Sequence, residues 1–159
     1  MQVYAAMIDS LDQNIGRLLR WLEENGYGQN TLILFISDNG ASAQNAENGT
    51  GEIGSASMWA SLLEDWANVA NTPLRYYKTD SYEGGIRSPM IAFWPGHIPA
   101  NSFSNYESHL IDIFPTLLDL PQAPYPETHK NKPVGPLSGN SLVPVLTGED
   151  IQSREGPLF

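Results

Sequence analysis

Apolar residues recur at helical spacing along residues 4–22. Charged and amide side chains fall mostly on the opposite face, and the apolar stripe consists of Tyr4, Met7, Ile8, Leu11, Ile15, Leu18, Leu19 and Leu22. A period of 3.6 residues with this separation predicts an amphipathic helix of about five or six turns. Asn25 and Gly26 end the pattern, and Gly26 can adopt the left-handed conformation that caps a helix.

A continuous apolar run at 32–36 then replaces the helical pattern. Such a run predicts a strand buried on both faces, as in the middle of an α/β sheet. A helix, a short loop at 27–30 and a buried strand are the usual pieces of a βαβ unit. A second run at 90–94 follows Pro89 and is closed by Pro95 and Gly96, which predicts a second strand.

The remaining segments are less regular. Residues 41–57 are mostly small and polar, which predicts a long loop, and a weak stripe of Met58, Leu62, Trp66 and Val69 predicts a short helix over 58–69. Apolar positions predict a helix over 111–120, with Pro115 near its first turn. The tail at 121–159 is rich in proline and glycine, and we expect it to be irregular except for a short helix at 141–146.

Composition limits the classes of function. The chain has 159 residues, is 41% hydrophobic and carries a formal net charge of −10. The length suffices for one domain with a core, and the negative charge argues against nucleic acid or an anionic membrane as a partner. Cysteine is absent, so disulfides, zinc–thiolate centres and cysteine nucleophiles are excluded within this stretch. The opening inside a helical pattern, without a basic leader, suggests a piece of a longer chain.

Polar residues follow the first predicted strand directly, in the order Ser37, Asp38, Asn39 and Gly40. Carboxylate and amide oxygens are hard ligands that suit Ca²⁺ or Mg²⁺, and the carboxyl ends of strands are where α/β proteins usually bind ligands. Gly40 can turn with φ > 0. Asp-Asn-Gly is also ordinary turn chemistry, so the residues alone leave a cation site and a plain turn equally open.

Three charged residues surround a double glycine further along the chain. Lys78 could hold a phosphate or sulfate or protonate a leaving group, although an exposed surface lysine is the commoner role. Arg87 is expected to fix a backbone turn or bind a carboxylate. Glu83 is expected to pair with one of these cations as outer support for a site. The pair Gly84-Gly85 allows close backbone approach or a tight turn.

The histidines lack the spacing of a metal or general-base site. His97, His109 and His129 have no second ligand at helical or turn spacing, so structural roles are favoured for all three. His109 precedes the helix predicted at 111–120 and is expected to cap it or to line a pocket. The nucleophile elbow, the P-loop and the dinucleotide-binding fingerprint are all absent.

Five motifs in one order give the chain a family resemblance. They are Ala6-Met7-Ile8-x-x-Leu11-Asp12-x-x-Ile15-Gly16; Asn30-Thr31-Leu32 leading to Ser37-Asp38-Asn39-Gly40; Lys78-x-x-x-Tyr82-Glu83-Gly84-Gly85-Ile86-Arg87-x-Pro89 with Trp94-Pro95-Gly96; Ile111-Asp112-Ile113-Phe114-Pro115-Thr116-Leu117-Leu118; and Gly139-x-Ser141-Leu142 with Leu146-x-Gly148. This series resembles the type I sulfatases, the arylsulfatase family of the alkaline phosphatase superfamily. The resemblance covers nearly the whole chain except the loop and short helix at 41–70, where family members vary in length.

The resemblance implies an α/β fold, namely part of an alkaline phosphatase-like three-layer αβα sandwich with a mixed sheet. It implies that Asp38 and Asn39 are ligands of a divalent cation, Ca²⁺ with Mg²⁺ as the alternative. It also implies that Lys78 contacts the sulfate ester and assists departure of the leaving oxygen. The substrate would be a sulfated small molecule or sugar. Family members are periplasmic, secreted or lysosomal, and this stretch contains no targeting signal that selects among these compartments.

One departure from the family pattern is important. The family nucleophile is a formylglycine made from Cys or Ser in a Cys/Ser-x-Pro-x-Arg signature, which this sequence lacks. The resemblance therefore implies that residues 1–159 are the carboxyl-side portion of a catalytic domain, inactive alone, which needs the amino-terminal half or otherwise self-associates. Two alternatives are a phosphonate or phosphodiester hydrolase of the same superfamily and a non-catalytic Ca²⁺-binding module.

Overall fold

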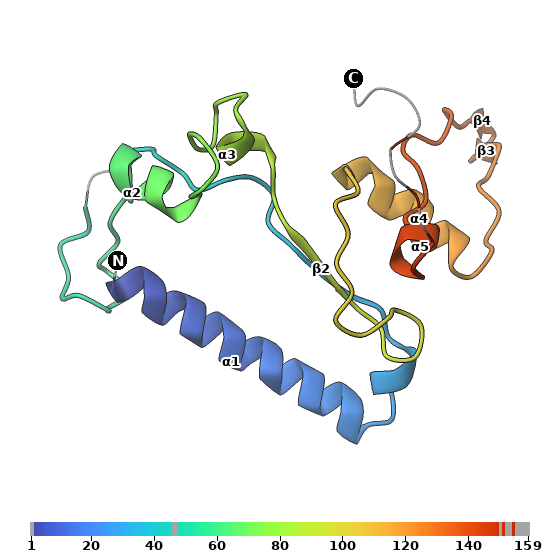
Figure 1. Cartoon of the computed structure of the whole chain (residues 1–159), viewed down its shortest axis with the longest axis horizontal. Helices are drawn as coiled ribbons and strands as arrows, with labels where there is room; N and C mark the ends of the chain where they lie inside the picture. The colour runs from blue at the N-terminus through green and yellow to red at the C-terminus, as the bar shows by residue number, and fades with distance from the viewer. Residues whose placement is uncertain (1, 46–47, 150, 152–153, 155–159) are drawn as a thin grey trace. The chain divides into compact units, whose positions relative to one another are not determined.

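The computed structural model describes residues 2–45, 48–149, 151 and 154, which form helices and short strands joined by loops (Figure 1). The chain divides into two compact units, Met1–Phe93 and Trp94–Phe159. None of the helices in the described ranges combines the length and the hydropathy that a membrane span requires.

The first element is helix α1 (Gln2–Glu24), which confirms the helix predicted from the apolar stripe. The helix ends as predicted, because Gly26 adopts a φ of 79° and the Tyr27 amide donates to the Leu22 carbonyl oxygen at 2.8 Å. No residue of α1 is buried, and Met7 of the stripe is 64% exposed. Ile15, Leu19 and Leu22 are half-buried, so the amphipathic face is formed but only partly covered within this chain.

A 3₁₀ turn, η1 (Gly28–Asn30), leads into strand β1 (Ile33–Ile36), which pairs with β2 (Met90–Phe93). The pairing is antiparallel, with Ile33 opposite Phe93 and Ile36 opposite Met90. The described strands thus contribute an antiparallel pair to the predicted mixed sheet, and β1 and β2 are not the two parallel strands of a βαβ unit.

The prediction that the first strand is buried on both faces was wrong for this chain. Phe35 and Ile91 are direct cross-strand partners, and they are 44% and 62% exposed. The reason is that β1 has one neighbouring strand among the described residues, so an edge and a face of the pair stay open. The apolar run at 32–36 suits a strand inside a larger sheet, with neighbours that the described part of this chain does not provide.

Between the two strands lie a long loop and two short helices. The described residues of the predicted loop at 41–57 form no helix or strand, and helix α2 (Leu63–Ala70) is shorter than the predicted 58–69. Its buried residue is Ala67, at 0% exposure, whereas Trp66 and Val69 of the predicted stripe are 49% and 52% exposed. Helix α3 (Glu83–Ile86) then places the double glycine just before β2.

The second unit confirms both predicted helices and adds a hairpin. The 3₁₀ turn η2 (Leu110–Asp112) runs into α4 (Ile113–Asp119), and the tail forms α5 (Val143–Leu146). Strands β3 (Thr128–His129) and β4 (Lys132–Pro133) pair through Lys130 and Asn131, whose φ values of 49° and 62° suit a tight hairpin turn. The hairpin escaped prediction because its strands are so short and because Pro133 argues against a strand.

Candidate active site

The loop after β1 carries Asp38 and Asn39, and its polar groups are partly committed. The Ser37 hydroxyl donates to the Asn39 carbonyl oxygen at 2.8 Å, and Asn39 Nδ2 donates to the Gly40 carbonyl oxygen at 3.0 Å. Within the described part of the chain, the Asp38 carboxylate and Asn39 Oδ1 have no hydrogen-bond or ion-pair partner. The loop therefore offers two adjacent side chains whose hard oxygen atoms remain free to bind a cation.

Gly40 allows a close approach of two backbone segments. Its φ is not in the left-handed region, so it does not use the freedom to turn with φ > 0 that the sequence offered. The Gly40 amide instead donates to the Gly85 carbonyl oxygen at 3.2 Å, and a Cβ at residue 40 would lie 1.7 Å from the Gly84 carbonyl oxygen. Gly40 thus permits two backbone segments to touch.

Lys78 lies on a second loop that is bonded directly to the first. Its backbone amide donates to the Ala41 carbonyl oxygen at 2.9 Å, and its side chain is half-buried. No described residue forms a hydrogen bond or ion pair with its ammonium group. The structure therefore brings the backbone of Lys78, the predicted sulfate-binding residue, against the loop that carries Asp38 and Asn39, the predicted ligands of a divalent cation.

The double glycine confirms the prediction of close backbone approach. The Gly84 amide donates to the Arg75 carbonyl oxygen at 2.8 Å, and a Cβ at Gly84 would lie 2.0 Å from the Tyr76 carbonyl oxygen. A Cβ at Gly85 would lie 2.1 Å from the Asp80 carbonyl oxygen. Both glycines are buried, so they allow the Lys78 loop to fold tightly over α3.

Asn71 links the two loops, and sequence reasoning missed it. Its Oδ1 accepts from the Ala41 amide at 3.0 Å, while its Nδ2 donates to the carbonyl oxygens of Tyr76 and Gly84, both at 2.9 Å. Asn71 is also the C-cap of α2. No pattern in the neighbouring sequence indicates that the Asn71 side chain bonds segments that are distant in the sequence.

Glu83 and Arg87 form the pair that was predicted for Glu83. Arg87 Nη1 lies 3.3 Å from Glu83 Oε2, and the two side chains are 63% and 58% exposed. An ion pair this exposed contributes about 0–1 kcal/mol to stability. The Arg87 amide also donates to the Glu83 carbonyl oxygen at 2.9 Å at the end of α3. Arg87 therefore binds a carboxylate and also takes part in a backbone turn, the two roles predicted for it.

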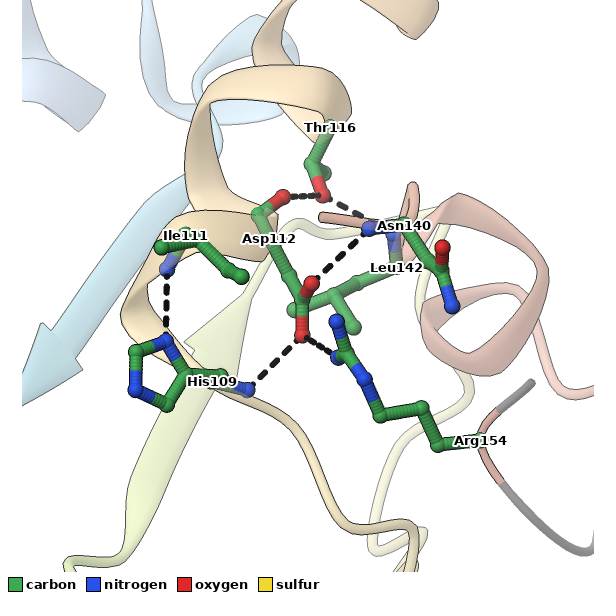
Figure 2. Close-up of polar contacts among 7 residues, drawn as sticks. All are labelled: His109, Ile111, Asp112, Thr116, Asn140, Leu142 and Arg154. Atoms are coloured by element: carbon green, nitrogen blue, oxygen red, sulfur yellow. Dashed lines mark hydrogen bonds and ion pairs between the residues drawn. The ribbon is translucent and has the colours of Figure 1, made fainter. Parts of the chain in front are cut away.

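His109 belongs to the second unit, where it has the capping role that the sequence suggested. Its Nδ1 accepts from the Ile111 amide at 3.2 Å, and its own amide donates to Asp112 Oδ2 at 2.7 Å (Figure 2). This reciprocal arrangement is a capping box at the start of η2. His109 therefore fixes the entry into α4.

Asp112 is a buried acid on which several hydrogen bonds of that unit converge (Figure 2). Besides His109, the Asn140 amide donates to its Oδ1 at 2.8 Å, and the Arg154 guanidinium forms an ion pair with Oδ2. Burial by itself would raise the pKa of Asp112, but the hydrogen bonds from Arg154, Asn140 and His109 outweigh it and lower that pKa below its ordinary value. A charged carboxylate thus ties η2 to the tail.

The donor set at residues 38 and 39 fits part of a cation site. A carboxylate and an amide oxygen are the right chemistry for Ca²⁺ or Mg²⁺, but Ca²⁺ takes about six to eight oxygen ligands. The described ranges contain no group of three or more carboxylate, histidine or cysteine side chains placed to hold a metal ion. The chain therefore carries some of the ligands that such a site needs.

Comparison with known proteins gives a consistent family. The family model for sulfatases matches residues 1–123. The chain is 33% identical to the arylsulfatase of Klebsiella aerogenes over 89% of its own length and 34% of that protein, and 30% identical to the N-acetylgalactosamine-6-sulfatase of Canis lupus familiaris over 98% and 25%. The chain thus spans between about a quarter and a third of these curated relatives.

Solved structures agree with this result. Ps i-CgsB in complex with k-i-k-neocarrahexaose is 31% identical, with a TM-score of 0.63 over 89% of this chain and 25% of that one. BT4656 in complex with its substrate D-glucosamine-2-N,6-O-disulfate is 29% identical, with a TM-score of 0.62 over 92% and 22%. The mixed helices and strands are thus part of an alkaline phosphatase-like domain. The chain belongs to the sulfatase family.

Proposed function

We propose that this chain supplies the cation-binding and leaving-group side of a sulfatase active site that hydrolyses sulfate esters. Asp38 and Asn39 contribute oxygen ligands to a divalent cation, Ca²⁺ with Mg²⁺ as the alternative. Lys78 contacts the sulfate ester. The observation that carries the proposal is the 2.9 Å hydrogen bond from the Lys78 amide to the Ala41 carbonyl oxygen, because it joins the cationic loop to the loop of the cation ligands.

The chemistry assigned to these residues follows from their charges. A divalent cation, when bound, polarises the sulfate oxygens and offsets their negative charge. The Lys78 ammonium has three N–H donors, so it can bind a sulfate oxygen and also donate a proton to the leaving oxygen as the ester bond breaks. Asp38 and Asn39 hold the ester's charged end near Lys78 by anchoring the cation.

The nucleophile of the proposed enzyme lies outside this chain. The sulfatase family generally uses a formylglycine, and this sequence has neither a cysteine nor the serine form of the Cys/Ser-x-Pro-x-Arg signature. We propose a sulfated sugar as the substrate class, with aryl sulfates as small-molecule surrogates. The sugar ligands of the two solved neighbours and the name of the Klebsiella aerogenes relative support this choice.

The test uses a grafted arylsulfatase, defined as the Klebsiella aerogenes enzyme in which this chain replaces the matching segment. We expect it to hydrolyse 4-nitrophenyl sulfate in the presence of Ca²⁺. Lys78→Ala and Asp38→Asn should each lower kcat by about 100-fold or more, since each removes charge stabilisation at the reacting ester. Asp38→Asn should in addition raise the Ca²⁺ concentration needed for half-maximal activity.

Matched controls separate site chemistry from general damage. Lys132→Ala removes an exposed lysine of β4, and Asp9→Asn replaces an exposed carboxylate of α1. Both grafted variants should keep activity within about threefold of the parent, as surface substitutions usually do. The proposal fails if a folded graft is inactive, or if Lys78→Ala and Lys132→Ala retain the same activity.

A further inference from the structure

The Asn71 carboxamide bonds three backbone segments, through both of its N–H groups and through its oxygen. Its two N–H donors meet the carbonyl oxygens of Tyr76 and Gly84 at 2.9 Å each, and its Oδ1 meets the Ala41 amide at 3.0 Å. A side-chain amide has two N–H donors and a carbonyl acceptor. The arrangement also fixes which atom is oxygen, because a flipped amide would face two carbonyl oxygens with its own oxygen.

Ala41 is held from both sides as a result. Its amide donates to Asn71, and its carbonyl oxygen accepts from the Lys78 amide at 2.9 Å. Ala41 follows Asn39 by two positions, so a shift of this peptide moves the proposed cation ligands. The same shift releases the backbone of Lys78, so Asn71 controls the two halves of the proposed site together.

Apolar packing provides little to replace this control. Among the described residues of the first unit, Ala67 is the one buried hydrophobic side chain. The contacts around Asn71 are between backbone segments that glycines allow to touch, with a Cβ at Gly40 and a Cβ at Gly84 each falling about 2 Å or less from a carbonyl oxygen. Polar bonds therefore set the spacing of the two loops.

We propose that Asn71 is a positioning residue of the sulfatase site, which holds the Asp38–Asn39 loop at its working distance from the Lys78 loop. The expected effect on catalysis rests on the proposed function. The claim that Asn71 holds the two loops together rests on its three hydrogen bonds. Asn71 acts through Ala41, Tyr76 and Gly84 and has no assigned contact with substrate.

The first experiment compares two asparagines of the same region in the grafted arylsulfatase. Asn71→Ala removes all three bonds and should lower kcat by about tenfold or more, because small misplacements of reacting groups are costly. It should also raise the Ca²⁺ concentration for half-maximal activity. The matched control is Asn68→Ala, which removes the bond from the Tyr76 amide to Asn68 Oδ1 at 3.1 Å and should stay within about threefold.

A second variant tests the hydrogen bonds themselves. Asn71→Asp keeps an acceptor for the Ala41 amide but faces two carbonyl oxygens with a carboxylate. Protonation gives that carboxyl an O–H donor. The activity of Asn71→Asp relative to the parent should therefore rise as the pH falls, whereas the relative activity of Asn71→Ala should stay flat. An equal pH profile for both variants would overturn the inference.

A third measurement does not depend on activity. In the 159-residue chain, Asn71→Ala should speed hydrogen exchange of the Ala41 and Lys78 amides by about tenfold or more. The Ala41 amide loses its acceptor, and the Ala41 carbonyl oxygen that accepts from the Lys78 amide is no longer held in place. Asn68→Ala should leave both rates within about threefold. Unchanged exchange at Ala41 in Asn71→Ala overturns the inference even if the graft is inactive. A further outcome also overturns the inference: the graft is active and depends on Lys78, but Asn71→Ala leaves its kcat and its Ca²⁺ requirement unchanged. In that case the proposed function still stands.

Discussion

Replacing Asp112 by alanine removes the acceptor at the centre of the second unit. The side chain is 0% exposed, and it accepts from the His109 amide, the Asn140 amide and the Arg154 guanidinium. Alanine would leave an Arg154 side chain that is 8% exposed without its counter-charge. Breaking a buried ion pair by removing one partner costs about 3–5 kcal/mol. The two orphaned amides overlap with this cost, so we expect a loss of about 3–5 kcal/mol.

A loss of this size is a large part of the stability of a typical domain, about 5–15 kcal/mol. The assay is a urea titration followed by NMR signals of residues 94–149, with the free energy of unfolding extrapolated to water. The control is Asp119→Ala, which removes an exposed carboxylate that accepts from the Ser141 hydroxyl at 2.5 Å. We expect about 1 kcal/mol or less for this control.

The outcome that refutes the reasoning is a loss of less than about 1 kcal/mol for Asp112→Ala, or a loss no larger than that of Asp119→Ala. Either result would mean that water reaches the Arg154 guanidinium and the two amides and replaces the hydrogen bonds that Asp112 supplied. Buried groups without access to solvent would instead be left unpaired, at the full cost. Signal loss across the whole second unit at zero urea would instead confirm a cost at or above the stability of that unit.

Four further predictions follow from the same structure. The lowered pKa of Asp112 stabilises the folded state above the ordinary value of 3.8, and this contribution should vanish as the pH falls through the lower folded value, so Asp112→Asn should unfold with less acid sensitivity in the same titration. Gly40→Ala should abolish activity of the grafted arylsulfatase, because its Cβ would meet the Gly84 carbonyl oxygen, while Gly16→Ala, whose nearest atom is 3.6 Å away, should not. The isolated chain should bind Ca²⁺ weakly or not at all by isothermal titration, because two oxygen ligands are few for this ion. Its rate of aryl sulfate hydrolysis should not exceed that of its Lys78→Ala variant. Tight Ca²⁺ binding by the chain, together with an inactive graft, would instead support a calcium-binding module. Sedimentation velocity should detect self-association of the isolated chain through its open sheet face, and a monodisperse monomer at high concentration would contradict this.

The elements of the fold that depend on neighbours in sequence were predictable. Helix α1, strands β1 and β2 and the helices at 113–119 and 143–146 follow from apolar spacing and from their glycine and proline boundaries. The burial of β1 was not predictable, because burial depends on what packs beside a strand and the apolar run records only what the strand suits. The hairpin at 128–133 was missed because two residues a strand carry no periodicity.

The candidate site was predictable in its charged residues and not in what holds them. Asp38, Asn39 and Lys78 stand in motifs that a family resemblance marks. Asn71 acts on partners 30 and 13 residues away, and Asp112 on partners 28 and 42 residues away. Asp112 stands in one of the quoted motifs, but the motif does not show which groups it bonds, and no motif includes Asn71. Only the folded backbone shows the partners of either residue.

The two bridging residues solve the same physical problem in separate units. Buried apolar residues are few among those the structure describes, Ala67 in the first unit and Pro115 and Leu142 in the second, so apolar burial gives their loops little support. A polar side chain that bonds several backbone groups is costly to displace, because each group it releases would be left unpaired. Asn71 thereby fixes the spacing of two loops that Gly40 and Gly84 allow to touch, and Asp112 ties η2 to the tail of the second unit.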